Sequence, residues 1–364
     1  MSATKDFERL RIGVVGAGHL GKIHCKLIRS VDDADLVAVC DPSPSAREFV
    51  EREFGVEPHE GLAAMLPRID AAIVAAATPI HGDVVGRLLE AGKHVFCEKP
   101  LTHDAETSRR LAMTAATKRL TLQVGHVERF NPAFVEAGDH LVDAKYIEAT
   151  RASSFPGRCL DVGVVMDLMI HDIDLVLSLA SGGVTDIRAT GLSVISEHED
   201  VAEARLEFSC GLVANLQASR ISPTACRTMR VLGPRGLVDL DFSGPTVSCL
   251  RPSPAVADRK FRLSEATENP MTFKETLFDE HLVADRWQPE PRNAILDEQH
   301  DFVLSIRSGS APTVDGHAGA LAVTVAERIL EEIEAKDFYG NGHADQTGMH
   351  AEPRRRLDDS RRAA

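Results

Sequence analysis

The sequence of 364 residues lacks three features that would each define a class of protein. Positive charge is not in excess, because 41 Lys and Arg residues face 55 Asp and Glu residues and leave a formal net charge of -14. This balance repels nucleic acid, whose binding depends on Lys and Arg neutralising phosphates. No apolar run approaches the length that spans a bilayer, and residues 1–11 are polar and charged, without the apolar core of a signal peptide. These absences predict a cytoplasmic protein with no nucleic-acid partner and no membrane insertion.

Closely spaced cysteine pairs, which zinc and redox motifs require, are also missing. The seven cysteines are odd in number and widely scattered, so we interpret them as reduced, small apolar residues. His171 and Asp174 have the i, i+3 spacing of two ligands on a helix, but no third ligand can be named. The sequence therefore predicts no metal site.

What is present is the composition of an ordinary globular protein, with 43% apolar and 26% charged residues. The length exceeds that at which one hydrophobic core keeps growing, which predicts two domains. Short apolar strands alternate with helices in the N-terminal third; the expected strands are 10–15, 36–40, 71–76, 94–97 and 121–124, and the helices are 20–29, 45–54, 81–91 and 105–118. Because parallel strands need crossover helices, this rhythm predicts an α/β fold with a doubly wound parallel sheet in domain 1–125.

A second domain, an α+β domain of residues 126–338 with a large, mostly antiparallel sheet, is predicted from a change of rhythm. A long apolar helix is expected at 165–179, then strands at 187–195, 202–209, 212–219, 228–232 and 237–242, and finally helices at 293–308 and 317–335. Residues 251–292 are predicted as loops, and residues 339–364 as a disordered tail. An uncovered sheet face would expose more apolar area than a monomer tolerates, so we expect a homodimer or homotetramer.

The segment Gly16-Ala17-Gly18-His19-Leu20-Gly21 carries a glycine fingerprint between a predicted strand and a predicted helix. In that context the first glycine permits a tight turn, the second lets the backbone approach a pyrophosphate, and the third packs the helix on the strand. Asp41 follows the second strand, where a carboxylate can bind the ribose hydroxyls and would repel a 2′-phosphate. NAD is therefore the predicted cofactor, although Arg47 could still permit some NADP binding.

Three further motifs resemble those of the Gfo/Idh/MocA oxidoreductase family. They are Thr78-Pro79-Ile80-His81, Cys97-Glu98-Lys99-Pro100 and Asp167-Leu168-Met169-Ile170-His171, and the likeness runs from about Leu10 to Ala335. The resemblance implies a Rossmann domain, a second domain with a mostly antiparallel sheet, and no catalytic metal. It places Lys99, Asp167 and His171 at the catalytic centre. The predicted cofactor contacts are the fingerprint residues, Asp41 and a further group formed by Thr78, Pro79, His81, Glu98 and Lys99.

Residues 124–132 and 160–166 look like the branch of this family that oxidises C3 of UDP-N-acetylglucosamine in lipid A assembly. The first segment supplies the predicted substrate contacts His126, Arg129 and Asn131, in addition to Asp167 and His171. Arg129 could pair with a diphosphate or form a surface salt bridge. His81 could cap its helix or touch the nicotinamide ribose.

The residue types suit hydride transfer from a secondary alcohol, because the hydroxyl proton must leave as the carbonyl forms. His171 can accept that proton near neutral pH. Lys99 can stabilise the developing oxyanion or serve as the base itself. Asp167 lies four residues before His171, so on a helix both share a face, and Asp167 can orient the histidine or bind a neighbouring hydroxyl.

We therefore expect an NAD-dependent dehydrogenase of a sugar hydroxyl, with C3 of UDP-N-acetylglucosamine as the leading substrate. A free cyclitol or monosaccharide is the second candidate. The two differ in whether the pocket carries cationic groups for a diphosphate, such as Arg129, Arg151 or Arg158. The third is a non-catalytic NAD-binding sensor, against which the joint presence of Lys99, Asp167 and His171 argues.

Overall fold

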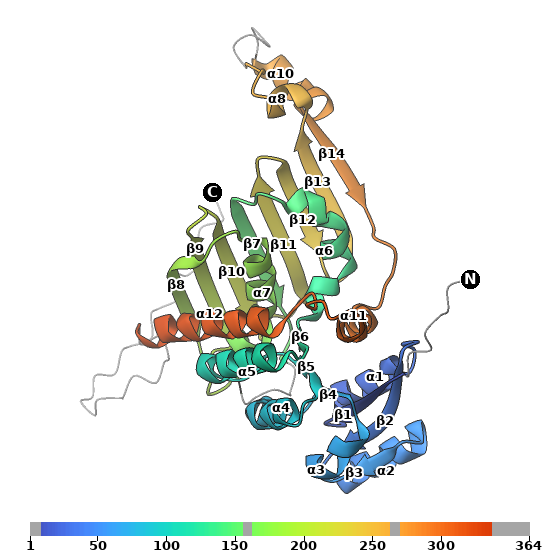
Figure 1. The fold of residues 1–364 in the computed structure, drawn as a ribbon. Coiled ribbons are helices and arrows are strands. Elements are labelled where there is room, and N and C mark those ends of the chain that lie inside the picture. Colours follow the sequence, from blue (N-terminus) through green and yellow to red (C-terminus); the bar gives the residue numbers. More distant parts are fainter. Residues whose placement is uncertain (1–8, 156–161, 263–269, 337–364) are drawn as a thin grey trace, which may run out of the picture.

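The computed structural model describes residues 9–155, 162–262 and 270–336 (Figure 1), so the predicted tail at 339–364 lies outside the described residues. The elements of the N-terminal region are β1 (Leu10–Val15), α1 (His19–Ile28), β2 (Ala34–Cys40), α2 (Pro44–Phe54), β3 (Glu57–His59), α3 (Leu62–Met65), β4 (Ala71–Val74), α4 (His81–Glu90), β5 (His94–Glu98), α5 (Ala105–Lys118) and β6 (Leu122–Gly125). The strands form a six-stranded parallel sheet in the order β3-β2-β1-β4-β5-β6. The predicted doubly wound sheet is confirmed.

Both faces of this sheet are covered, which explains why its strands are almost continuously apolar. Ile12 and Ile73 belong to a core shared with α1 and α2, whereas Val15 and Ala72 belong to a core shared with α4 and α5. Alternate side chains of a strand point to opposite faces, so neither face can be polar. The carboxyl ends of the strands remain as the place where polar groups can gather.

The second sheet is built from residues further along the chain. Its region contains α6 (Pro132–Ala137), β7 (Tyr146–Ala152), a π-helical segment (Val165–Met169), α7 (Ile170–Leu179), β8 (Val184–Leu192), β9 (Val201–Phe208), β10 (Val213–Ser219), β11 (Cys226–Gly233), β12 (Gly236–Asp241), β13 (Thr246–Pro252), α8 (Pro254–Ala257), α10 (Pro270–Thr276), β14 (Leu282–Trp287), α11 (Ala294–Ser308) and α12 (Gly316–Glu334). The eight strands are ordered β14-β13-β12-β11-β7-β10-β9-β8. Every pair is antiparallel except β10 with β7, as the prediction of a mostly antiparallel sheet requires.

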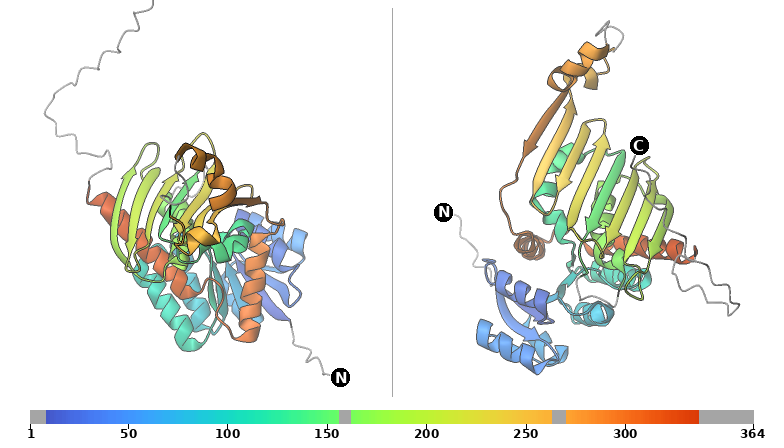
Figure 2. Two further views of the ribbon diagram at one scale, coloured as in Figure 1. Left: turned by 90° about the horizontal axis from the view of Figure 1, so that it is seen from above. Right: turned by 180° about the vertical axis from the view of Figure 1, so that it is seen from behind.

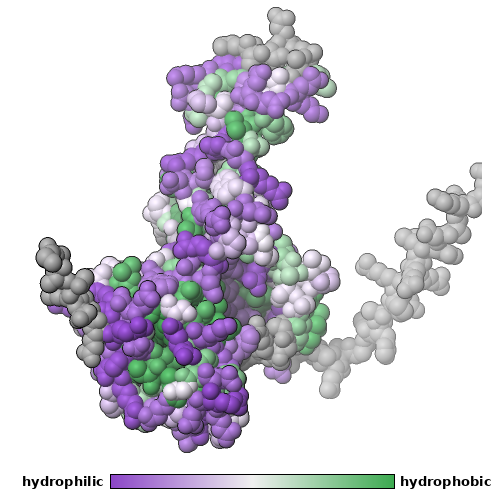
Figure 3. Space-filling model, turned by 90° about the vertical axis from the view of Figure 1, so that its right-hand side faces the viewer, coloured by the Kyte–Doolittle hydropathy of each residue, from purple (hydrophilic) through white to green (hydrophobic). Residues whose placement is uncertain are grey.

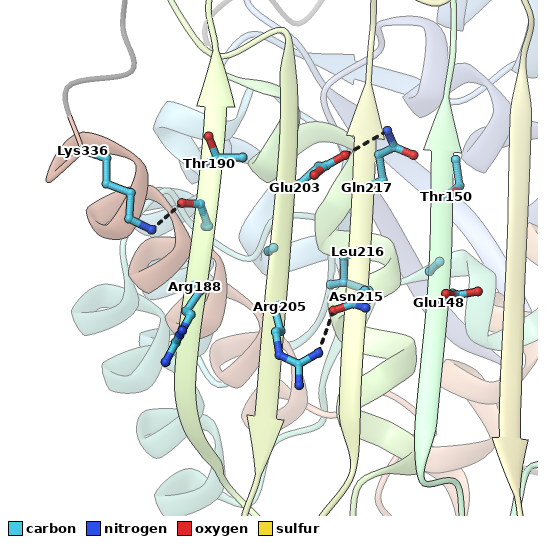
Figure 4. Close-up of a pocket in the computed structure, with 13 residues that line it drawn as sticks. Glu148, Thr150, Arg188, Thr190, Glu203, Arg205, Asn215, Leu216, Gln217 and Lys336 are labelled. Atoms are coloured by element: carbon cyan, nitrogen blue, oxygen red, sulfur yellow. Dashed lines mark hydrogen bonds between the residues drawn. The ribbon is translucent and has the colours of Figure 1, made fainter.

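One face of the second sheet packs against helices α7 and α12, and the other face is open (Figure 2). The open face is polar, since Glu148, Thr150, Arg188, Glu203 and Arg205 project from it (Figure 4). The expectation of a large exposed apolar face is therefore wrong, because the outward positions of these strands carry charged and hydroxyl side chains. The homodimer or homotetramer that rested on it stays a prediction.

The last two helices return to the first sheet. Helix α11 packs on α1, and its Phe302 and Val303 belong to the same core as Ile12. Helix α12 lies across α5 and α7 (Figure 1). Residues beyond position 290 therefore help to build the surroundings of the first sheet, while the predicted boundary at residue 125 stays a prediction.

Several segments differ from the sequence-based expectation, and β3, α3, α6 and most of β13 were not expected. The region predicted as loops, 251–292, contains the end of β13, helices α8 and α10, and the edge strand β14. Strand β14 has little burial on either face, so its sequence lacks an apolar alternation. Strand β7 was not predicted because one of its inward positions is taken by Arg151, which breaks the apolar pattern.

The end of the second sheet that carries α8 and α10 projects from the molecule and has a mainly hydrophilic surface with a few hydrophobic side chains (Figure 3). Met271 and Phe278 are among the large exposed apolar residues of the described part of this projection. Within the part of the chain that the structure describes, no helix combines the length and the hydropathy needed to cross a membrane.

Candidate functional site

The glycine fingerprint has the geometry that a dinucleotide requires. Gly16 has a φ of +93°, and a Cβ on Gly21 would lie 1.8 Å from the carbonyl oxygen of Gly16. Gly18 immediately precedes helix α1, and a Cβ there would meet nothing within 4 Å. The tight turn and close packing are thus provided by the outer glycines, and the middle glycine leaves open space in front of the helix N-terminus for a pyrophosphate.

Asp41 lies beside this loop at the end of β2. Its carboxylate accepts hydrogen bonds from the backbone N–H of Ala17 at 2.7 Å and of Ser43 at 2.8 Å. Arg47 donates to the backbone oxygens of Asp41 and Pro42, at 2.9 and 2.8 Å. Asp41 is therefore held against the fingerprint, and one end of the Arg47 guanidinium is already bound to the protein rather than free for a 2′-phosphate.

Lys99 and Asp167 meet although they are far apart in sequence. Lys99 Nζ donates to the backbone oxygen of Asp167 at 2.6 Å and to its Oδ1 at 3.0 Å. Both side chains are partly exposed, and the peptide bond between Lys99 and Pro100 is cis. Asp167 belongs to the π-helical segment that leads into α7, and His171 stands at the start of α7. The structure thus brings the three predicted catalytic residues to one place, at the carboxyl end of β5.

His171 is neutral in these surroundings. Burial lowers the pKa of His171 well below its ordinary value of 6.5, and the positive charge of Lys99 lowers it further. Its Nδ1 has no hydrogen-bond partner among the described residues. A neutral imidazole is the form that accepts a proton, so the site can supply a base.

His126 adjoins His171, with the two rings perpendicular and their centroids 6.3 Å apart. The ring is buried, and neither of its nitrogens has a partner within the described ranges. Burial also lowers the pKa of His126. Buried ring nitrogens without a partner are rare in proteins and are typical of places where a ligand supplies the missing contact.

Two arginines near the site are already engaged. Arg151 is buried and forms charge-assisted hydrogen bonds with Glu128 at 2.6 Å and with both carboxylate oxygens of Asp172 at 2.8 and 3.0 Å. Arg129 donates to the backbone oxygen of Thr313 at 3.2 Å. The expectation that Arg151 is available for a diphosphate is therefore wrong, because its guanidinium is buried and bound to two carboxylates. This burial was not evident from the sequence.

Within the described ranges the Arg129 guanidinium makes that one hydrogen bond, and its Nε lies 3.9 Å from a carboxylate oxygen of Asp174. It stays a candidate for contact with an anionic substrate. Arg158 lies outside the described residues, so its part in a diphosphate site stays a prediction.

Several predicted contacts have structural partners instead. His81 is buried and its ring nitrogens face the backbone oxygens of Pro100 at 2.9 Å and Ala76 at 3.0 Å, so the ring braces two loops rather than capping its helix. Asn131 caps α6 by accepting from the N–H of Ala133, and its amide donates to Glu128 and to the backbone of Phe242. Substrate contact by Asn131 stays a prediction.

The remaining predicted cofactor contacts lie near the strand ends. His19 is exposed and Leu20 partly buried at the start of α1, and Thr78 and Pro79 lie just before α4 at the surface. Glu98 differs from these, since its side chain is buried and contacts His24 at 2.6 Å. Its side chain faces His24 of helix α1, and its contact with the cofactor stays a prediction.

The sequence did not reveal Glu199, a residue that holds the start of the π-helical segment before α7 in place. Glu199 is buried and its carboxylate accepts from the N–H of Val165 at 3.0 Å, while the N–H of Val164 donates to its backbone oxygen at 2.9 Å. Gly163 is required at this contact, because a Cβ there would lie 2.0 Å from the carboxylate. Nothing in the sequence pattern marks Glu199 as buried, since it lies in a polar run between two predicted strands.

The comparisons with known proteins agree with this geometry. Residues 10–126 match the model of the oxidoreductase family with an NAD-binding Rossmann fold, GFO/IDH/MocA, and residues 141–239 match the model of its C-terminal domain. The inositol 2-dehydrogenase of Rhizobium meliloti is 31% identical over 90% of this chain and 98% of its own length. The chain belongs to the Gfo/Idh/MocA family.

A second relative, the UDP-N-acetylglucosamine 3-dehydrogenase of Acidithiobacillus ferrooxidans, is 29% identical over 90% of this chain and 98% of the relative. A solved structure of that enzyme has a TM-score of 0.79 and 28% identity, and covers 90% of this chain and 99% of the other. As a member of the Gfo/Idh/MocA family with an intact fingerprint, the protein is an NAD-dependent oxidoreductase.

Proposed function

We propose that the protein oxidises a secondary hydroxyl of a sugar or cyclitol to a ketone, with NAD as the hydride acceptor and Lys99, Asp167 and His171 as the catalytic residues. The observation that carries the proposal is the contact of the Lys99 ammonium with Asp167, one helical turn before a neutral histidine. A cation and a neutral base that meet beside a dinucleotide-binding loop are the groups that alcohol oxidation needs.

In the proposed reaction the alcohol C–H bond breaks, its hydride leaves for the nicotinamide, and the hydroxyl proton passes to His171 as the carbonyl forms. His171 suits this role because its low pKa keeps it unprotonated at neutral pH. The ammonium of Lys99 stabilises the negative charge that develops on the oxygen. Asp167 fixes Lys99 by two hydrogen bonds and is placed to bind a neighbouring hydroxyl.

Further contacts are assigned by position. Gly16, Gly18 and Gly21 hold the pyrophosphate with His19 and Leu20 at the start of the helix, and Asp41 binds the adenosine ribose. Thr78 and Pro79 border the cofactor at the next strand end. His126, with two unpartnered ring nitrogens, and Arg129 contact the substrate.

For the substrate itself we favour C3 of UDP-N-acetylglucosamine. The support is similarity over nearly the full length of the Acidithiobacillus enzyme of that name, in sequence and in fold. A free cyclitol is the second candidate, supported by the inositol 2-dehydrogenase relative. It is also supported by the engagement of Arg151, which leaves Arg129 as the described arginine among the three candidates that could still contact a diphosphate.

A direct assay separates these candidates. The pure protein is incubated with NAD and either UDP-sugars or polyols, the absorbance of reduced cofactor is followed, and the position of the new ketone is found by NMR. Reduction with UDP-N-acetylglucosamine and a ketone at C3 supports the first candidate, and reduction only with inositols or free sugars replaces it by the second. NAD binding without turnover of any member of the panel would contradict the catalytic proposal and favour a sensor.

A further inference from the structure

A second cluster of ionisable groups lies on the other side of the strand end that carries Lys99. It consists of His24 on α1, Glu98 at the end of β5 and Glu298 on α11, and all three side chains are buried. One nitrogen or oxygen atom of each residue lies within 4.8 Å of the other two. Three segments that are distant in the sequence therefore place one imidazole and two carboxylates around a common point.

Glu298 has no partner that explains its presence there. Neither of its carboxylate oxygens has a hydrogen-bond partner within the described parts of the chain, although the residue is fully buried. Burial raises the pKa of Glu298 well above its usual range, and the charges of Glu98 and Asp301 raise it further. A buried carboxyl group without a hydrogen-bond partner destabilises the folded state. The surroundings of Glu298 thus favour a species that brings positive charge.

We propose that His24, Glu98 and Glu298 bind one divalent transition cation, for which Zn²⁺ is the best-matched ion. Two carboxylates neutralise the charge of the ion, so the filled cluster carries no net charge in the core. One imidazole nitrogen with carboxylate oxygens is a ligand set that Zn²⁺ accepts, whereas Mg²⁺ and Ca²⁺ require more oxygen ligands. Three protein ligands leave one tetrahedral position for a small ligand such as water.

In the pair His24 and Glu98, metal binding requires only a small movement of the two ligand atoms. His24 Nε2 and Glu98 Oε1 are 2.6 Å apart, whereas two ligands of a tetrahedral Zn²⁺ at ~2.0–2.1 Å are separated by roughly 3.4 Å. Binding therefore replaces the shared proton by the ion and separates the two atoms by less than about 1 Å. Gly125 gives Glu98 its room, since a Cβ there would lie 2.9 Å from the carboxylate.

The neighbouring amide can complete the arrangement. Gln299 Nε2 lies 2.7 Å from His24 Nδ1, and Gln299 Oε1 has no partner among the residues described. When Nε2 of His24 binds the ion, Nδ1 carries the proton, and a half-turn of the Gln299 amide presents Oε1 to it. Ligating histidines are commonly held in this way by a second acceptor. The site would fasten α1, α11 and the strand end before Lys99 together.

The proposal is tested on the full chain stripped of metal with a chelator and dialysed. Calorimetric titration with Zn²⁺ should give one tight site per chain, and Tm should rise with Zn²⁺ concentration and not with Mg²⁺. Glu298→Gln preserves size and removes the negative ligand, so its Zn²⁺ affinity should fall about 100-fold or more. Glu331→Gln, which changes an exposed glutamate of α12, is the matched control and should bind as the wild type does.

Absence of a tight site in the stripped wild type would overturn the proposal and leave a proton as the occupant of the cluster. Tight binding that Glu298→Gln does not weaken would also overturn it and point to surface histidines. Should this variant not fold, Co²⁺ bound to the wild type decides, because one tetrahedral equivalent gives intense visible absorption. Weak octahedral binding of Co²⁺ would contradict the proposal. Since no outcome involves turnover, the result is independent of the proposed function.

Discussion

Glu98 ends strand β5 and Lys99 follows it directly, yet the two side chains lie in opposite kinds of surroundings. Glu98 is enclosed with His24 between α1 and α11, while Lys99 reaches the partly exposed Asp167 in the π-helical segment before α7. Successive side chains near a strand end point to opposite sides of the sheet, which is how two adjacent residues serve two sites. A short motif carried over as a unit from a family can therefore divide into one residue that packs in the core and one that reaches the proposed catalytic site.

The comparison is tested most strongly by Lys99→Met. The change removes the cation that contacts Asp167 and keeps most of the apolar stem, so NAD affinity should be nearly unchanged. Turnover of the accepted substrate should fall about a hundredfold or more, as for the loss of one oxyanion-stabilising or acid/base group. Steady-state kinetics and a cofactor titration measure the two effects.

The matched control is Lys118→Met, at an exposed lysine near the end of α5. It should leave turnover and cofactor affinity as in the wild type. Unchanged turnover in Lys99→Met would remove this lysine from the mechanism, and an equal loss in both variants would point to a general effect of lost charge.

For Glu98, the buried residue of the pair, the comparison predicts that Glu98→Ala lowers the stability of the fold. The buried His24 Nε2 and the N–H of Lys99, 2.6 and 3.2 Å from the carboxylate, would lose their acceptor. With chelator present throughout, the free energy of unfolding should fall by about 1–3 kcal/mol, measured in urea. Glu98→Gln keeps an acceptor and should lose less. A Glu98→Ala variant as stable as the wild type would mean that the hydrogen bonds of the Glu98 carboxylate do not contribute to the free energy of unfolding.

The sequence contained enough to predict the parallel sheet and the mostly antiparallel sheet, and to name residues that the structure brings together. The meeting of Lys99, Asp167 and His171 was predictable because each lies at a strand end or on a helix with a regular pattern, while their catalytic roles stay a prediction. The parallel strands were predictable because burial on both faces makes them continuously apolar. The predicted bounds of several helices were also close to the observed ones, as for the helix Ala105–Lys118.

What could not be predicted depends on contacts between distant segments. The cofactor contact of Glu98 stays a prediction, but the sequence does not show that Glu298 and His24 lie beside its carboxylate. Arg151 looked like a free cation because its partners Glu128 and Asp172 come from other elements. Strand β7 was missed for the same reason, since a charged residue on an inward position is explained only by those partners.

The smallest expected effect concerns the charge state of His171. Because burial and the cation of Lys99 both disfavour the imidazolium, its pKa is below 6.5, and His171 should stay neutral as the pH falls through that value. The acid limb of kcat/KM in the wild type should therefore lie below pH 6.5. In Lys99→Met the largest of the causes other than burial is lost, so the pKa of His171 should move upward while burial still holds it below the ordinary value.

The ring is followed by NMR titration, and its signal among the fifteen histidines is assigned by its disappearance in His171→Asn. Lys118→Met serves again as the control and should leave the titration of His171 in place. If the ring already titrates at 6.5 or above in the wild type, the imidazole is charged under working conditions and cannot be the base. The proton would then have to pass to Lys99. In that case the Glu98 side and the Lys99 side of the strand end would still differ in burial, but the proposed role of His171 as the base on the Lys99 side would be lost.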